Sequence, residues 1–320
     1  MSPPETRPTL DRGGVGLGAS AHVIWGLFPA FWPLLDPAQP TEILAHRILW
    51  TMVLMAGVLT VLRGWGALRG LSRATWLRVT AAAVLITLNW GVFIYGVLIG
   101  RVVDVALGYY INPLVSTLLA ILVLRERPTR LQGLALAIAA AAVVVISIGA
   151  GSPPWLGLVL AVSFALYGLM KKTIPLPSTA GLTAEGLVVG PLALVYVVAL
   201  QLTGHGTFTD HGGGHVLLMI LAGPATTLPL LLYGAAARRI PLTTLGTLMY
   251  LTPTLQFLWG VLVLHETMPV TRWVGFGLVW IALVVFTVDL WRSTRRAPGD
   301  GSRRMREVGG VGGPRGRQPT

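Results

Sequence analysis

The sequence predicts an all-α, polytopic membrane protein with ten transmembrane helices in two inverted five-helix repeats. Three observations lead to this fold class. Apolar stretches of helical length fill the chain from about Gly16 to Leu290. Only 11% of residues are charged and 54% are hydrophobic, against about 25% charged in soluble domains. The second half also repeats the landmarks of the first. With a mean hydropathy of +0.72, lipid is the expected solvent.

The first half is expected to supply five spans, because a bilayer core takes about 20 apolar residues per helix. These spans are 16–35, 43–62, 76–99, 103–124 and 131–149. Polar turn residues from Asp36 to Pro40 separate the first two spans. Pro29 and Pro33 lie inside the first span and are interpreted as kinks that permit gating.

The second half is expected to supply five more spans, at 153–172, 183–203, 215–236, 242–264 and 270–290. Pro-, Gly- or Lys-containing segments mark its first turns, at 151–154 and 171–177. Pro224 and Pro229 in the eighth span are interpreted as kinks. The repeats are therefore assigned to 14–150 and 151–291. Residues 1–13 and 292–320 are polar and are expected to be disordered cytoplasmic ends.

The clearest internal repeat is a proline followed thirteen residues later by a glutamate. Pro113 leads to Glu126, and Pro253 leads to Glu266. Other landmarks recur at a nearly constant offset: Tyr95-Gly96 with Tyr233-Gly234, Arg101 with Arg239, Leu107-Gly108 with Leu245-Gly246, and Trp25-Gly26 with Tyr167-Gly168. Five spans is an odd number, so the second copy enters the membrane from the opposite face. Inverted repeats are typical of secondary transporters, whose substrate site lies near the midplane.

The cations predict the orientation of the chain. With the N-terminus cytoplasmic, twenty-one Lys and Arg residues fall on the inside, and only Arg47, Arg101 and Arg272 fall outside. Both termini are therefore expected in the cytoplasm. The protein itself is expected in the inner (plasma) membrane. The net charge of +12 arises from short loops and the tail, so nucleic-acid binding is not expected.

Several short motifs resemble a known family. They are Trp25-Gly26-Leu27-Phe28-Pro29, Glu42 to Arg47, Asn89-Trp90, and Leu107 to Leu114. Together with the Pro…Glu repeat, they resemble the EamA domains of the drug/metabolite transporter superfamily, and within it the RarD-type permeases. The resemblance covers nearly all of 14–292. It implies an inner-membrane permease for metabolites or drugs, often labelled as related to chloramphenicol sensitivity.

Polar residues inside the spans are the candidates for the substrate pathway. His46 and Arg47 lie about one turn inside the second span. Arg47 either snorkels to outer headgroups or orients an anionic group, with His46 as a titrating partner. Asn89, beside Trp90, either joins helices or faces a wet cavity. No acidic residue is expected at mid-membrane.

The fourth and ninth spans supply the strongest candidate face. Asn112 and Ser116 are four residues apart, so they share one side of a helix with Tyr109 flanking them. Pro113 removes a backbone hydrogen bond there. Equivalent or paired positions complete the pathway candidates: Trp25, Tyr167, Tyr250, Thr252, Pro253 and Gln256.

Glu126 and Glu266 end symmetric spans on opposite faces. Each is expected to cap or pair locally, Glu266 with Arg272, in preference to a direct role in transport.

The sequence favours a permease that works by alternating access, with a small-molecule substrate and membrane lipid as partners. It has no cysteine, no phosphate-binding loop, no hydrolase motif and no cluster of metal ligands, so no enzymatic activity, cofactor or metal is expected. A lipid flippase and a membrane-embedded enzyme acting on lipid-linked substrates are the alternatives. A homodimer is an open alternative for the oligomeric state.

Overall fold

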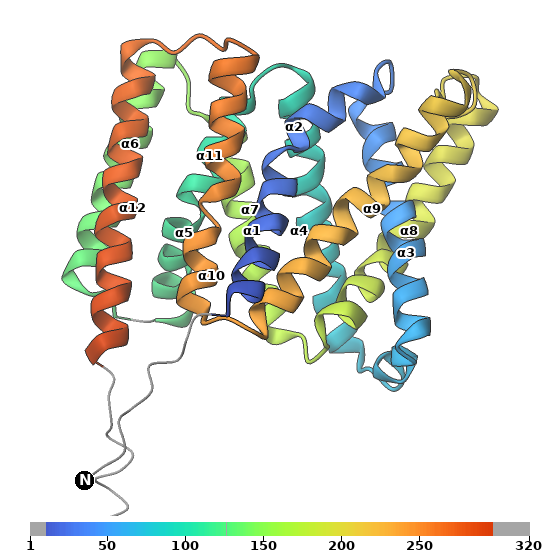
Figure 1. Cartoon of the computed structure of the whole chain (residues 1–320), viewed down its shortest axis with the longest axis horizontal. Helices are drawn as coiled ribbons and strands as arrows, with labels where there is room; N and C mark the ends of the chain where they lie inside the picture. Colours follow the sequence, from blue (N-terminus) through green and yellow to red (C-terminus); the bar gives the residue numbers. More distant parts are fainter. Residues whose placement is uncertain (1–10, 126, 297–320) are drawn as a thin grey trace, which may run out of the picture.

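The computed structural model describes residues 11–125 and 127–296, and within them the chain is helical with no β-strand (Figure 1). The first half contains α1 (Arg12–Gly26), α2 (Phe28–Phe31), η1 (Trp32–Leu35), α3 (Pro40–Val61), η2 (Gly64–Leu68), α4 (Arg73–Leu98), α5 (Val102–Leu124) and α6 (Arg130–Ala150). The second contains α7 (Trp155–Thr173), α8 (Ser178–Leu202), α9 (Gly212–Ala237), α10 (Leu242–Leu248), α11 (Leu251–Leu258), η3 (Trp259–Val263) and α12 (Val270–Arg296).

Nine helices in the described part of the chain are long and apolar enough to cross a bilayer, and one broken pair brings the number to ten. Most ends lie close to the expected ones because local caps define them. The Thr129 side chain and Gln132 form a reciprocal capping box at the start of α6. Asp11 caps α1, and α12 continues to Arg296, so the helices extend beyond the halves expected from sequence. The polar ends at 1–10 and 297–320 lie outside the described residues.

Two spans are broken and the others continue through their prolines. The first span bends by 43° between α1 and the α2–η1 segment, where Pro29 and Pro33 lie. The ninth is interrupted between α10 and α11 and ends in the π-helical η3. By contrast, Pro224 and Pro229 lie within the unbroken α9, and Pro113 lies within α5. A proline inside an apolar helix therefore predicted a break correctly in only some of these positions.

The helices pack in the pattern that two related halves would produce. Three pairs join counterparts from the two halves: α3 with α8, α5 with α11, and α6 with α12. The contact of α4 with α7 is matched by that of α9 with α1. We call the lower face in Figure 1, where α1 begins and α12 ends, the termini face, and the opposite face the far face.

Large apolar side chains cover the outside of the helix bundle. Ile148 is 76% exposed, Leu192 72% and Leu202 83%. In water such a surface would aggregate, whereas in a bilayer it contacts lipid tails. The chain is therefore a multi-pass membrane protein.

Candidate functional site

A central cavity of about 270 Å³ lies between the two halves. Its lining comes from α1 to α5 of the first half, and from α7, α8, α9, α11 and the break between α10 and α11 in the second. Twelve of the residues singled out from sequence line it: Trp25, Arg47, Asn89, Trp90, Tyr109, Asn112, Pro113, Tyr167, Tyr250, Thr252, Pro253 and Gln256.

Aromatic side chains close the cavity toward the far face. Phe28 and Phe93 line it and are buried, and they pack in one apolar cluster with Trp32 and Leu35, which are completely buried. Toward the termini face, the lining residues Tyr167, Tyr233 and Met249 are partly exposed. The cavity is thus more open toward the termini face than toward the far face.

Arg47 lies in the far-face wall of this cavity. Its side chain is only 3% exposed, so it does not extend to the membrane surface as a snorkelling side chain would. Its Cζ lies 4.2 Å from the ring centroid of Trp90, 5.1 Å from that of Trp32 and 5.4 Å from that of Phe28. Rings of this kind attract a cation but accept no strong hydrogen bonds. Arg47 Nε and Nη1 accordingly have no hydrogen-bond partner in the described structure.

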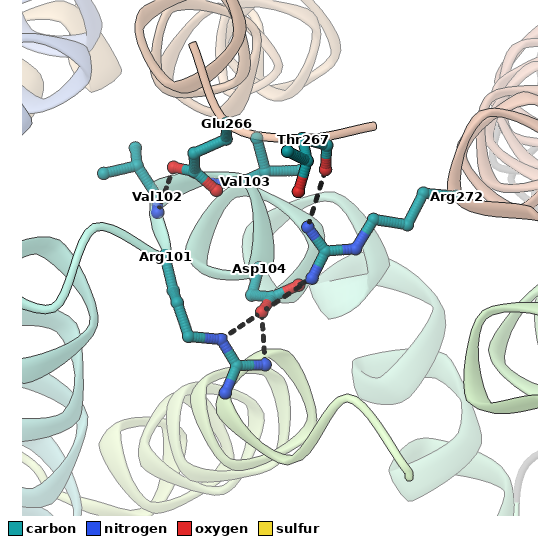
Figure 2. Close-up of polar contacts among 7 residues, drawn as sticks. All are labelled: Arg101, Val102, Val103, Asp104, Glu266, Thr267 and Arg272. Atoms are coloured by element: carbon teal, nitrogen blue, oxygen red, sulfur yellow. Dashed lines mark hydrogen bonds and ion pairs between the residues drawn. The ribbon is translucent and has the colours of Figure 1, made fainter. Parts of the chain in front are cut away.

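Two sets of polar contacts join the halves at the start of α5, one made by Glu266 and the other by Asp104 (Figure 2). Glu266 accepts hydrogen bonds from the amide of Val102 at 2.6 Å and from that of Val103 at 3.1 Å, so it caps the start of α5. Burial raises the pKa of Glu266 above that of a free carboxyl group, and the two amides oppose the rise. The expected partner, Arg272, instead forms an ion pair with Asp104 at 3.1 Å. The expected local pairing of Glu266 was wrong, because the helix start of the other half lies closer.

A further link on the far face involves the loop before α9. Glu42 accepts a hydrogen bond from the Thr207 amide at 2.7 Å. His46 stacks on Phe208 of the same loop, with ring centroids 4.5 Å apart. His46 is 2% exposed and is not part of the cavity lining, because it faces this loop.

Asn89 both joins helices and lines the cavity. Its Nδ2 donates to the carbonyl of Leu160 at 2.9 Å and to Ser163 Oγ at 3.0 Å, while Tyr109 Oη donates to its Oδ1 at 3.3 Å. Asn112 likewise donates to the carbonyl of Ala161 at 3.1 Å. The two alternatives considered for a buried amide are therefore compatible, since these amides bind α7 beside the cavity.

The second half ties α11 to α1 in the corresponding way. His22 Nδ1 lies 3.0 Å from Thr252 Oγ1, which donates to the His22 carbonyl at 3.0 Å. Gln256 Nε2 donates to the carbonyl of Trp25 at 3.3 Å. Gln256 Oε1 and His22 Nε2 are buried without a hydrogen-bond partner in the described structure. They are polar groups available to a molecule in the cavity.

Sequence reasoning missed a buried carboxylate. Glu185 is 3% exposed, contacts Lys171 Nζ at 2.7 Å and accepts a hydrogen bond from Tyr167 at 3.1 Å. The expectation concerned acidic residues at mid-membrane, and Glu185 was overlooked because its span was expected to begin at residue 183, whereas α8 begins at Ser178. That shift moves Glu185 about two turns into the helix, and Tyr167 connects it to the cavity.

Other predicted residues lie elsewhere. Ser116, Pro29 and Glu266 are not part of the cavity lining, and Glu126 lies outside the described residues. Lining residues not proposed for the pathway from sequence are His22, Phe28, Ile86, Phe93, Phe164, Leu182, Thr226, Leu230, Tyr233 and Met249. His22 carried a usable signal, since it precedes Trp25 by three residues and so shares its helix face. Within the described ranges, no three His, Asp or Glu residues are grouped to hold a metal ion.

Comparisons with known proteins agree with this architecture. Residues 12–148 match the family model described as "EamA-like transporter family". The chain is 48% identical to Protein RarD of Streptomyces exfoliatus, over 90% of this chain and 92% of that one. It is 44% identical to Uncharacterized transporter YojE of Bacillus subtilis, over 86% of this chain and 94% of that one. With Protein RarD of Escherichia coli the identity is 37%, over 89% and 97%.

A solved structure matches with a TM-score of 0.57 at 15% identity, over 89% of this chain and 99% of that one. At this identity the likeness shows a shared fold alone.

Proposed function

The chain belongs to the EamA-like transporter family, and on that premise we propose that it is a secondary permease of the inner membrane. It moves small organic metabolites or drugs by alternating access, with both termini in the cytoplasm. One observation carries the proposal: a central cavity is lined by both halves, and its far-face side is closed by contacts between those halves. Halves that rock against each other would open such a cavity to each face in turn.

The direction of opening follows from the same geometry. The far-face wall is buried and the termini-face lining is partly exposed. With both termini cytoplasmic, this arrangement corresponds to an inward-facing state. Opening to the outside would require the Glu266 cap and the Asp104–Arg272 pair to separate.

Single-cysteine labelling tests alternating access directly, because the chain contains no cysteine. Met249→Cys places a thiol in the cavity, and Gly66→Cys places one in an exposed turn as the matched control. In oriented vesicles, a membrane-impermeant maleimide should label Met249→Cys from either side and Gly66→Cys from the cytoplasmic side only. Labelling of Met249→Cys from a single side under all conditions would contradict alternating access.

Two alternatives remain to be separated by transport assays. A lipid flippase would share the fold but accept amphiphilic lipids through a lateral opening, whereas a permease prefers soluble metabolites. An embedded enzyme would need acid, base or nucleophilic groups to converge, and no Asp or Glu is among the described residues that line the cavity. One relative, 29% identical, is named Chloramphenicol-sensitive protein RarD of Pseudomonas aeruginosa, so chloramphenicol belongs in the substrate panel.

A further inference from the structure

The cavity lining carries a single formal charge. Arg47 is the only Arg, Lys, Asp or Glu among the described residues that line it, and nine lining residues are Phe, Trp or Tyr. No carboxylate of the described residues forms a salt bridge with Arg47. The salt bridges found there join Asp104 to Arg101 and Arg272, and Glu185 to Lys171. The cavity lining therefore carries one positive charge, that of Arg47, in an aromatic surrounding.

The burial of this charge is costly unless an anion accompanies it. Taking a guanidinium out of water loses its hydration, and aromatic faces return only part of that free energy. Nε and one terminal nitrogen of Arg47 still lack acceptors. A guanidinium binds a carboxylate in a bidentate manner through Nη2 together with either Nε or Nη1, so each of these two nitrogens leaves one edge of Arg47 open to a carboxylate oxygen.

We propose that the cavity takes an aromatic monocarboxylate, with its carboxylate on Arg47 and its ring among the aromatic lining. The inference rests on the proposed function, since it names the substrate class of the same cavity. A monoanion is favoured over a dianion because the lining supplies one positive charge. An amino-acid zwitterion is disfavoured because its ammonium group would find no carboxylate there.

Cavity size and the remaining polar groups narrow the class further. About 270 Å³ is near the lower end of small-molecule sites, which begin at roughly 300 Å³, so a body of one or two rings is expected. Gln256 Oε1 is a buried acceptor without a partner in the described structure. It would accept a hydrogen bond from a ring N–H, so an indole carboxylate is the most informative probe.

The test uses four ligands that share one ring system. Indole-3-propionate carries a carboxylate, tryptamine an ammonium group, tryptophan both and 3-ethylindole neither. Each is titrated by calorimetry into the full-length protein in lipid nanodiscs. We expect indole-3-propionate to bind at least about 10-fold more tightly than the other three, the size of charge-assisted hydrogen bonds. Equal or tighter binding of tryptamine, tryptophan or 3-ethylindole, or no binding of indole-3-propionate, would overturn the inference.

Variants then assign the preference to Arg47. Arg47→Gln should lose about 10- to 100-fold in affinity for indole-3-propionate and bind 3-ethylindole unchanged. Arg47→Lys should be intermediate because it keeps the charge but not the planar fork. Arg130→Gln removes an exposed arginine outside the cavity and should match the unmodified protein. Unchanged affinity in Arg47→Gln would refute the assignment.

Misfolding and failure of the permease proposal can both be recognised. Removing a buried unpaired charge is not expected to destabilise the fold, and thermal unfolding of each variant checks this. If Arg47→Gln still fails to fold, the ligand series on the unmodified protein decides alone. Arg47-dependent binding without uptake into proteoliposomes would refute the permease proposal and support the carboxylate site. Uptake of other compounds that does not depend on Arg47 would support the permease proposal and refute the carboxylate site.

Discussion

Asn112 shows how much one residue's position in the cavity depends on its neighbours. Its four-residue spacing to Ser116 predicted a shared polar face. In the structure Asn112 is 5% exposed, lines the cavity and binds the Ala161 carbonyl, whereas Ser116 is not part of the lining. The helix period alone predicted the face, but the packing of α7 against α5 decided which member of that face reaches the cavity.

Asn112→Leu should insert and fold nearly normally, because it makes the span more apolar, and should reduce transport at least about 10-fold. The reduction would follow from the loss of a polar group in the pathway and of the bond to α7. Ser116→Leu is the matched control and should transport normally. Membrane abundance and uptake of an identified substrate are measured together; full activity of Asn112→Leu would remove this face from the pathway.

Glu185 supports a prediction about stability. Glu185→Ala should destabilise the protein by about 2 kcal/mol or more, because Lys171 would keep a charge without its partner. The loss should stay below the ~3–5 kcal/mol of fully buried pairs, since the Lys171 side chain is 26% exposed. Thermal unfolding in detergent measures it. The double variant Lys171→Met, Glu185→Leu should recover much of the loss, and a double variant less stable than Glu185→Ala would argue against this account.

At the scale of helices, equivalent glycines of the two halves have different surroundings. A Cβ added at Gly108 would lie 2.7 Å from the Gly157 carbonyl oxygen of α7, whereas one added at Gly246 of α10 would meet no atom within 4 Å. Glycine lets α5 and α7 approach closely, in the way small residues do in membrane helix pairs. The sequence repeat pairs these glycines, but only the packing distinguishes them.

Gly108→Ala should therefore destabilise the protein by about 1–3 kcal/mol, because the backbone of α7 cannot move aside without disturbing the cavity wall. Gly246→Ala should be neutral, or stabilising by up to about 1 kcal/mol from helix propensity. Unfolding temperatures of the two purified variants give the comparison. Similar effects at both positions would show that close packing of α5 on α7 is not limiting.

At the scale of the whole molecule, the closed far face depends on contacts between halves. Glu266→Ala removes the cap on α5 and should favour separation of the halves there. A lost cap costs about 0.5–2 kcal/mol, which corresponds to a rise of about 2- to 30-fold in the population of the open state. Ala38→Cys reports opening of the far face, because Ala38 is only 6% exposed and packs in the same apolar cluster as Phe28 and Trp32.

An impermeant maleimide should accordingly label Ala38→Cys faster in the Glu266→Ala background. Asp210→Ala removes an exposed acid from the loop between α8 and α9 and should leave the labelling rate unchanged. Equal rates in all three backgrounds would mean that the Glu266 cap does not hold the far face closed.

Topology is the second prediction at this scale. Reporter fusions should place both termini and the loop around Arg69 in the cytoplasm, and the loop around His211 outside, because the cations are so unevenly distributed. A fusion at Gly213 that reports a cytoplasmic position would contradict both the orientation and the inversion of the second half.

The sequence by itself determined the membrane-spanning fold, most helix limits and several residues that line the central cavity, among them Asn89, Asn112 and Gln256. These features depend on apolar length, local caps and an internal repeat, all of which are properties of neighbouring residues along the chain. Only the tertiary structure decided that Arg47 is buried among three rings, that His46 faces a loop and that Glu185 pairs with Lys171. Such contacts depend on which helix faces pack together, and residues far apart in sequence meet there without any local signal.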